Sequence, residues 1–121
     1  MDNSLINNGV NGNINISESV ISNIAKVATM EVEGVNSLTK GVTSTISEFI
    51  SNGKYPTGIK VESDNHIVNI DLSIEVKYGY SINDVAYNVQ KNVKTAIENM
   101  TTLIVETINV TVSGLVFDNK N

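Results

Sequence analysis

The chain has 121 residues and a formal net charge of −5 at pH 7, so it is long enough for one domain with its own core. It contains no Cys, which excludes disulfides, thiol chemistry and zinc sites built on thiolates. Its single His, His66, excludes most imidazole-rich metal centres. All eight basic residues are Lys, and the acidic balance disfavours a protein that binds the phosphate backbone of nucleic acid.

The two ends of the chain are polar and differ from its middle. Residues 1–12 contain two Asn-Gly pairs, which mark turns, and predict a flexible tail. A single domain is expected over residues 13–117, followed by a C-terminal tail at residues 118–121. No segment approaches the roughly 18 apolar residues that span a bilayer. The first residues also lack the basic and apolar regions of a signal peptide. We therefore expect a cytoplasmic protein without direct membrane insertion.

The first elements are a short strand, a helix and a second short strand. Asn and Ile alternate over residues 13–16, which predicts the first strand. Ser17 is the expected N-cap of the helix, and Gly34 the expected left-handed residue that closes it. The helix has one apolar sector, formed by Val20, Ile21, Ile24, Ala25, Val27, Ala28 and Val32. Residues 35–38 predict the second strand.

Residues 39–57 are the least regular part of the chain. They are either a surface loop with a small apolar anchor or a functional segment. A third strand is expected near residues 59–61, and residues 63–66 predict a hairpin turn. The next strand alternates strictly, with Val68, Ile70, Leu72, Ile74, Val76 and Tyr78 on one face and Asn69, Asp71, Ser73, Glu75 and Lys77 on the other. Such alternation predicts a sheet that is buried on one side and solvated on the other.

The second helix and the last strand have clear signals. Ser81 and Asp84 match a capping box, and the apolar residues from Ile82 to Met100 fill one sector of the helix. In the last strand Ile108, Val110 and Val112 are expected to point inward. We expect pairing of that strand to begin after Glu106, whose charge would otherwise share the inward face. Gly114 predicts a bulge.

These elements predict an α+β fold with the order β-α-β-loop-β-β-α-β. The expected architecture is a two-layer sandwich, in which two amphipathic helices cover one face of a small, mostly antiparallel sheet. A ferredoxin-like split βαβ connectivity is the arrangement that we expect.

The sequence offers no convincing catalytic constellation. Ser63, Asp64 and His66 share a solvated turn, where a catalytic triad could not be oriented. Asp71 and Glu75 lie roughly 13 Å apart along one strand, whereas a glycosidase pair needs about 5–10 Å. The glycines form no phosphate-binding loop. We therefore expect no enzyme activity, no cofactor, no metal and no small-molecule substrate.

Two groups of side chains are candidates for binding a partner. The polar face of the sheet is either an interaction surface or plain solvated surface, and its candidate residues are Asn69, Asp71, Ser73, Glu75, Asn109 and Thr111. On the second helix, Tyr87 could anchor a partner. Lys91 and Lys94 beside it give a weak nucleic-acid signal, and the alternative is a solvated helix face.

Short pieces distributed along residues 12–117 carry a family resemblance. They include Glu31-Val32-Glu33-Gly34-Val35, Gly58-Ile59-Lys60-Val61, Val89-Gln90-Lys91-Asn92-Val93-Lys94 and Ile108-Asn109-Val110-Thr111-Val112-Ser113-Gly114-Leu115-Val116-Phe117. In this order and spacing the chain resembles the alkaline shock, or general stress, protein family found chiefly in Gram-positive bacteria. That family often has Pro where Glu33 stands, which affects one helix end.

The resemblance implies a function that the residues alone do not. It implies a non-enzymatic protein of the cell-envelope stress response, which self-associates as a homo-oligomeric scaffold. It also implies a location at the cytoplasmic membrane through a membrane-anchored protein partner. A regulatory subunit that binds an enzyme of fatty-acid synthesis, such as acetyl-CoA carboxylase, is the alternative. The net charge of −5 disfavours direct docking on anionic lipid.

Overall fold

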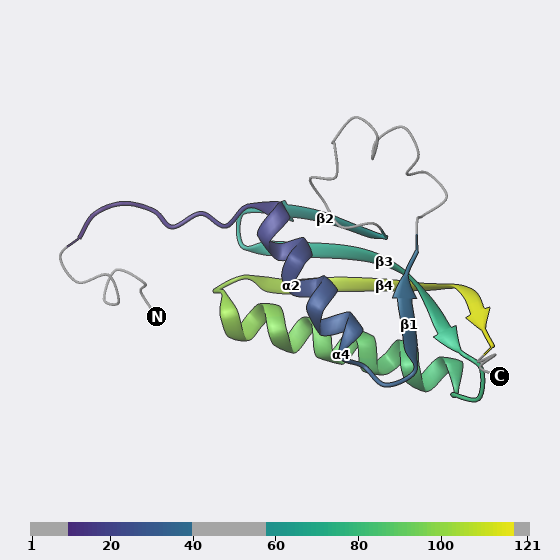
Figure 1. Ribbon diagram of the computed structural model, residues 1–121. Coiled ribbons are helices and arrows are strands. Elements are labelled where there is room, and N and C mark those ends of the chain that lie inside the picture. Colours follow the sequence, from purple (N-terminus) through teal and green to yellow (C-terminus); the bar gives the residue numbers. More distant parts are fainter. Residues whose placement is uncertain (1–9, 40–57, 118–121) are drawn as a thin grey trace, which may run out of the picture.

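The computed structural model describes residues 10–39 and 58–117 (Figure 1). Its elements are α2 (Glu18–Met30), β1 (Val35–Leu38), β2 (Ile59–Asp64), β3 (Ile67–Lys77), α4 (Ile82–Met100) and β4 (Ile104–Val116). Both helices lie on the same face of the four-stranded sheet. The predicted α+β fold with two layers is therefore confirmed.

The central strand of the sheet is β3. On one of its edges β2 pairs antiparallel with the first half of β3, and β1 pairs antiparallel with the second half. On the other edge β4 runs parallel to β3 along the whole of it. The sheet is therefore mixed: two of the three pairings are antiparallel, and the longest is parallel.

The strand expected at residues 13–16 does not form. Ile14 is 85% exposed, and only Ile16 packs against the core. One partly buried side chain in a four-residue segment gains too little to hold a strand on the sheet. The split βαβ prediction is wrong for the same reason, since that arrangement requires this strand between β3 and β4. Without it, β3, α4 and β4 form a direct parallel unit with a helical crossover.

Strands β1 and β2 together form one interrupted strand. They run in the same direction and meet opposite Ser73. The backbone N–H of Thr39 donates to the Ser73 carbonyl at 2.9 Å, and the Ser73 N–H donates to the Gly58 carbonyl at 2.9 Å. The loop predicted over residues 39–57 lies outside the described residues, apart from Thr39. The chain therefore leaves and re-enters the sheet at a single point.

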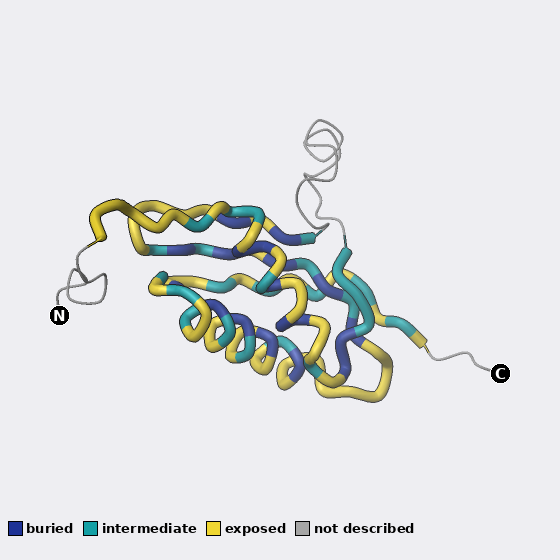
Figure 2. Tube along the Cα trace, turned by 60° about the vertical axis from the view of Figure 1, so that its left-hand side comes forward, coloured by how far each residue is buried: buried dark blue, intermediate teal, exposed yellow. Residues whose placement is uncertain are grey.

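The core lies between the helices and β3. The five inward residues of β3 from Val68 to Val76 are all at most 2% exposed, as their alternation predicted. Figure 2 shows buried positions alternating along β3 and following the inner side of α4. The prediction fails at Tyr78, which is 63% exposed because β3 ends at Lys77. Its ring stacks on Phe117 with 4.6 Å between the ring centroids.

Helix α2 begins as predicted and ends differently. The Ser17 side chain accepts from the Val20 N–H, so Ser17 is the N-cap. The helix ends at Met30 with Glu31 as C-cap, and Gly34 lies three residues farther on with a φ of +99°. Only part of the predicted apolar sector is buried. The buried side chains of α2 are Ile21, Ser22, Ala25, Ala28 and Thr29, and Ile24 and Val32 pack against the core while partly exposed.

Strand β4 contains two irregularities. Pairing with β3 begins at Ile104, before Glu106, so the prediction of a later start is wrong. Glu106 instead lies in a bulge between the pairs Val68–Val105 and Asn69–Thr107, which leaves it exposed. The bulge predicted at Gly114 is confirmed, since the register shifts again just before that residue.

Candidate functional site

The polar sheet face consists of the outward side chains of the sheet, on the side opposite the helices. The parallel register of β3 and β4 pairs Asp71 with Asn109 and Ser73 with Thr111. Six of the nine predicted interaction residues are therefore brought together on this face, namely Asn69, Asp71, Ser73, Glu75, Asn109 and Thr111. Whether they bind a partner stays a prediction.

Hydrogen bonds between strands fix the side chains of the polar sheet face. Thr107 Oγ1 donates to Asn69 Oδ1 at 2.6 Å, and Asn109 Nδ2 donates to Asp71 Oδ1 at 2.8 Å. On the other side of β3, Glu75 Oε1 accepts from Ser37 Oγ at 3.0 Å and from Asn36 Nδ2 at 3.1 Å. Because each carboxylate has a neutral donor, the face is ordered before any partner arrives.

Three residues that contribute to this face, Asn36, Thr39 and Thr107, were not among the candidates. Thr107 and Ser113 lie on it, and Thr39 and Ser113 share a hydrogen bond of 2.5 Å between their hydroxyls. Thr107 and Ser113 alternate with apolar residues in the last strand, and this pattern predicts that both point outward. The contribution of Asn36 depends on an irregularity between Val35 and Ser37, which no local pattern signals.

The other three candidates lie on α4, in the helix layer, and are separate from the polar sheet face. Tyr87 is 58% exposed, and Lys91 Nζ stands 5.3 Å from the centre of its ring. Lys94 forms an ion pair with Glu98 at 2.9 Å and donates to the Val105 carbonyl at 3.4 Å. Both lysines therefore have partners within the domain.

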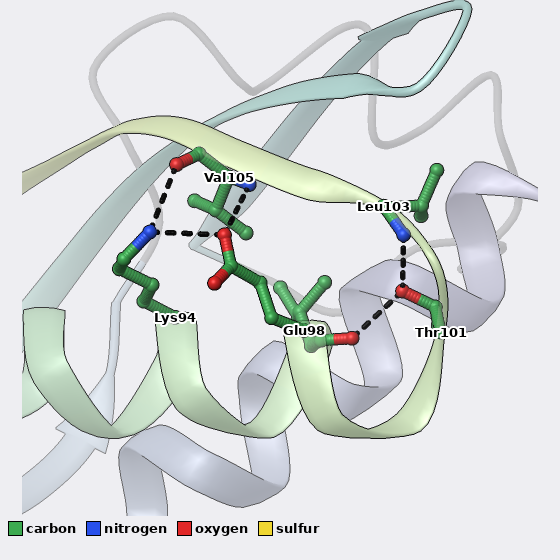
Figure 3. A network of polar contacts seen from close by, with 6 residues as sticks. Lys94, Glu98, Thr101, Leu103 and Val105 are labelled. Carbon is green, nitrogen blue, oxygen red and sulfur yellow. Dashed lines mark hydrogen bonds and ion pairs between the residues drawn. The ribbon is translucent and has the colours of Figure 1, made fainter. Parts of the chain in front are cut away.

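A network of polar contacts joins the end of α4 to the start of β4 (Figure 3). Glu98 accepts from Lys94 and from the Val105 N–H, the latter at 2.8 Å. The hydrogen bond from Lys94 and then the one from Val105 lower the pKa of Glu98 below its usual range. Thr101 Oγ1 donates to the Ile97 carbonyl at 2.7 Å and accepts from the Leu103 N–H at 3.0 Å. These contacts fix the turn between the two elements.

Two shallow grooves flank α4. One, of about 210 Å³, separates α4 from β4, and Gln90 beside it donates to the Ile108 carbonyl at 3.0 Å. The other, of about 420 Å³, lies between α4 and the residues that follow α2, with Glu31, Glu33 and Lys91 in its lining. Neither groove gathers the groups of a reaction centre. Within residues 10–39 and 58–117, no three His, Asp or Glu side chains are grouped so that they could hold a metal ion.

A helix that spans a bilayer has about 20 predominantly apolar residues. No helix within residues 10–39 and 58–117 is long and apolar enough to do so.

The fold defines a small two-layer α+β domain that is similar to solved structures of the MamM CTD. One of these matches with a TM-score of 0.51 and 13% identity, covering 81% of this chain and 98% of the other. A copper form of the MamM CTD matches with a TM-score of 0.51 and 12% identity, over 81% and 98% of the two chains. At this identity the likeness is one of fold alone.

Sequence comparison identifies the family. A model of the Asp twenty-three family, described as having a cell envelope-related function, matches residues 7–117. YqhY of Bacillus subtilis is 33% identical over 90% of this chain and 81% of its own length. Spy1535 of Streptococcus pyogenes is 34% identical over 87% and 80%, respectively. The chain belongs to the Asp twenty-three family, which confirms the resemblance to alkaline shock proteins.

Proposed function

We propose that this protein is a non-enzymatic, self-associating scaffold of the cell-envelope stress response. In this proposal a membrane-anchored protein partner holds it at the cytoplasmic membrane and docks on the polar sheet face. The cell envelope-related function of the family supports the cellular setting. The observation that carries the docking surface is the set of interstrand hydrogen bonds on the polar sheet face.

The chemistry of this face suits a protein partner. Its side chains are short and held by strands, so little conformational entropy is lost when a partner binds. The two carboxylates already accept hydrogen bonds from Asn109, Ser37 and Asn36, which lowers the cost of covering them. Ser73 and Thr111 lie side by side near the middle of β3 and can offer hydroxyl groups to the partner.

The test is the cellular location of a variant that carries Ser73→Lys and Asn109→Lys. Two long cations on the polar sheet face would block a partner that docks there, so we expect the variant to be lost from the membrane fraction of the native host. A matched control, Thr95→Lys on the exposed side of α4, should stay in that fraction. Immunoblots of fractionated cells give the measurement.

Two results would contradict the proposal. One is a wild-type protein that never sediments with membranes in its native host. The other is a folded double-Lys variant that sediments as the wild type does. A pull-down distinguishes the alternative function. If the wild type, and not the variant, recovers acetyl-CoA carboxylase and no membrane protein, the protein is a regulatory subunit and the scaffold proposal is wrong.

A further inference from the structure

Among residues 10–39 and 58–117, side chains cover the outer edge of β4 in its first part only. Three side chains of α4 bond its backbone there: Glu98 and Lys94 at Val105, and Gln90 at Ile108. Backbone groups that face one edge alternate along a strand, so Val110 and Val112 face the same edge as Ile108. Within the described residues, no side chain of α4 bonds the backbone beyond Ile108. We call residues 109–113 along this edge the free β4 edge.

The edge of β2 and the outer edge of β4 differ in charge. In β2 every second residue is charged, with Lys60, Glu62 and Asp64. In β4 the eleven residues from Thr107 to Phe117 include neither a charged residue nor Pro, and six of them are β-branched. Proteins usually protect an exposed strand edge with charged residues, Pro or a covering element. The edge of β2 has that protection, and the free β4 edge does not.

We propose that the free β4 edge is a self-association site, at which β4 of a second copy adds as an antiparallel strand. This inference rests on the self-association in the proposed function and deepens it, because it names the surface. In a two-fold pairing centred on Thr111, Val110 of each copy lies opposite Val112 of the other. The backbone groups of these two residues then form four hydrogen bonds between the copies.

The position of α4 favours the antiparallel direction. Its side chains cover the β4 edge from Val105 to Ile108, so a second strand has no access there. In antiparallel pairing, the covered part of each copy lies opposite residues 114–117 of the other. The bulge before Gly114 interrupts the regular strand at that end. Parallel pairing would bring the two covered parts together.

Charge favours a second copy of this chain as the occupant. Two molecules of net charge −5 repel each other wherever acidic surfaces meet. The free β4 edge carries no charge, so it can face itself without opposing acids. Glu106 is the nearest acid within β4 itself, and antiparallel pairing centred on Thr111 separates the two Glu106 residues by about ten positions, roughly 33 Å. That separation exceeds the Debye length of about 8 Å at physiological ionic strength.

Two variants test the site in the full chain, by analytical ultracentrifugation over a range of concentrations. Val110→Pro removes an N–H that faces outward, so the pairing with β3 stays intact and two of the four intermolecular bonds are lost. We expect the dimer dissociation constant to rise roughly 100-fold. Thr111→Lys places two cations opposite each other at the two-fold axis and should give a monomer. Circular dichroism checks that both variants remain folded.

The control is Ser73→Lys, which changes the polar sheet face and leaves the free β4 edge intact. We expect it to remain dimeric. A wild type that is monomeric at millimolar concentration would overturn the inference, as would a Thr111→Lys variant that dimerises with wild-type affinity. Membrane fractionation of the Val110→Pro variant separates the two proposals. A monomer that still sediments with membranes retains the proposed docking while lacking self-association.

Discussion

Glu98 is the residue that ties the last turn of α4 to the start of β4. Its carboxylate accepts from Lys94 on its own helix and from the Val105 N–H on the strand. Because both hydrogen bonds stabilise the ionised carboxylate, the pKa of Glu98 is lowered in the folded chain. A carboxylate with a lowered folded-state pKa stabilises the fold when it is ionised.

The variant Glu98→Gln should therefore lose a stabilisation that depends on pH. That stabilisation is fully present above the ordinary Glu pKa of 4.5 and disappears as the pH falls through the lower folded-state value. We expect the free energy of unfolding of the variant to be below that of the wild type at pH 7, and the difference to shrink below pH 4.5. Urea denaturation at several pH values measures it. The exposed residue Glu106 provides the control variant Glu106→Gln, and an equal pH dependence of the two variants would contradict this role for Glu98.

Gly34 illustrates a backbone position that tolerates no side chain. Its φ is +99°, and a Cβ placed there would lie 2.7 Å from Val85 Cγ2 and 3.0 Å from the Tyr80 ring. We expect Gly34→Ala to lower the free energy of unfolding by about 2–4 kcal/mol, since backbone strain adds to a clash in the core. Gly79→Ala is the matched control, because Gly79 has a φ of +102° and no atom within 4 Å of its Cβ position. Chemical denaturation of the pair should show a clearly smaller loss for Gly79→Ala, and equal losses would show that the clash contributes nothing.

At the scale of the elements, α2 buries two hydroxyl side chains while two of its valines are exposed to solvent. Ser22 and Thr29 are 0% exposed, and their hydroxyls have no hydrogen-bond partner among the described residues. Val20 and Val27 of the same helix are 47% and 58% exposed. A buried hydroxyl without a partner costs roughly 1–3 kcal/mol. Helix α2 is therefore less stabilising than its apolar content suggests.

The conservative change Thr29→Val tests this description of α2. Replacing the unpaired hydroxyl with a methyl group of similar size should raise the free energy of unfolding by about 1 kcal/mol. Thermal unfolding followed by circular dichroism measures the change. The exposed position Thr95 supplies the comparison, because Thr95→Val removes a hydroxyl that already contacts water. A Thr29→Val protein less stable than the wild type would show that the hydroxyl has a partner after all.

The elements that local patterns predict best are β3 and α4. Both bury one regular face, so a period of two or 3.6 residues marks them directly. The immediate neighbour of β4 could not be predicted, because the expected connectivity places the strand at residues 13–16 between β3 and β4, and that strand fails to form. The polar sheet face follows from alternation along β3 and β4. The protection of the β4 edge by Gln90 and Lys94 cannot be predicted from alternation, because those contacts depend on how α4 packs beside the strand.

At the scale of the whole molecule, the two proposed surfaces are compatible with each other. The polar sheet face covers one side of β3, and the free β4 edge lies at the border of the same sheet. Pairing of two β4 strands would join the two sheets into one and keep both polar sheet faces on the same side. A dimer could then hold two membrane-anchored partners at once, and binding through both would strengthen the tether without any new contact.

The charged edge of β2 has a consequence for how far such an assembly could grow. A pair joined through β4 has β1 and β2 of each copy at its two ends, and the β2 part of each end presents Lys60, Glu62 and Asp64. A further strand would have to cover these charges, so addition of a third molecule along β2 is disfavoured. The proposed contact is isologous and would close on itself, in contrast to the head-to-tail contacts that produce filaments. Growth beyond the pair would require a different surface of the molecule.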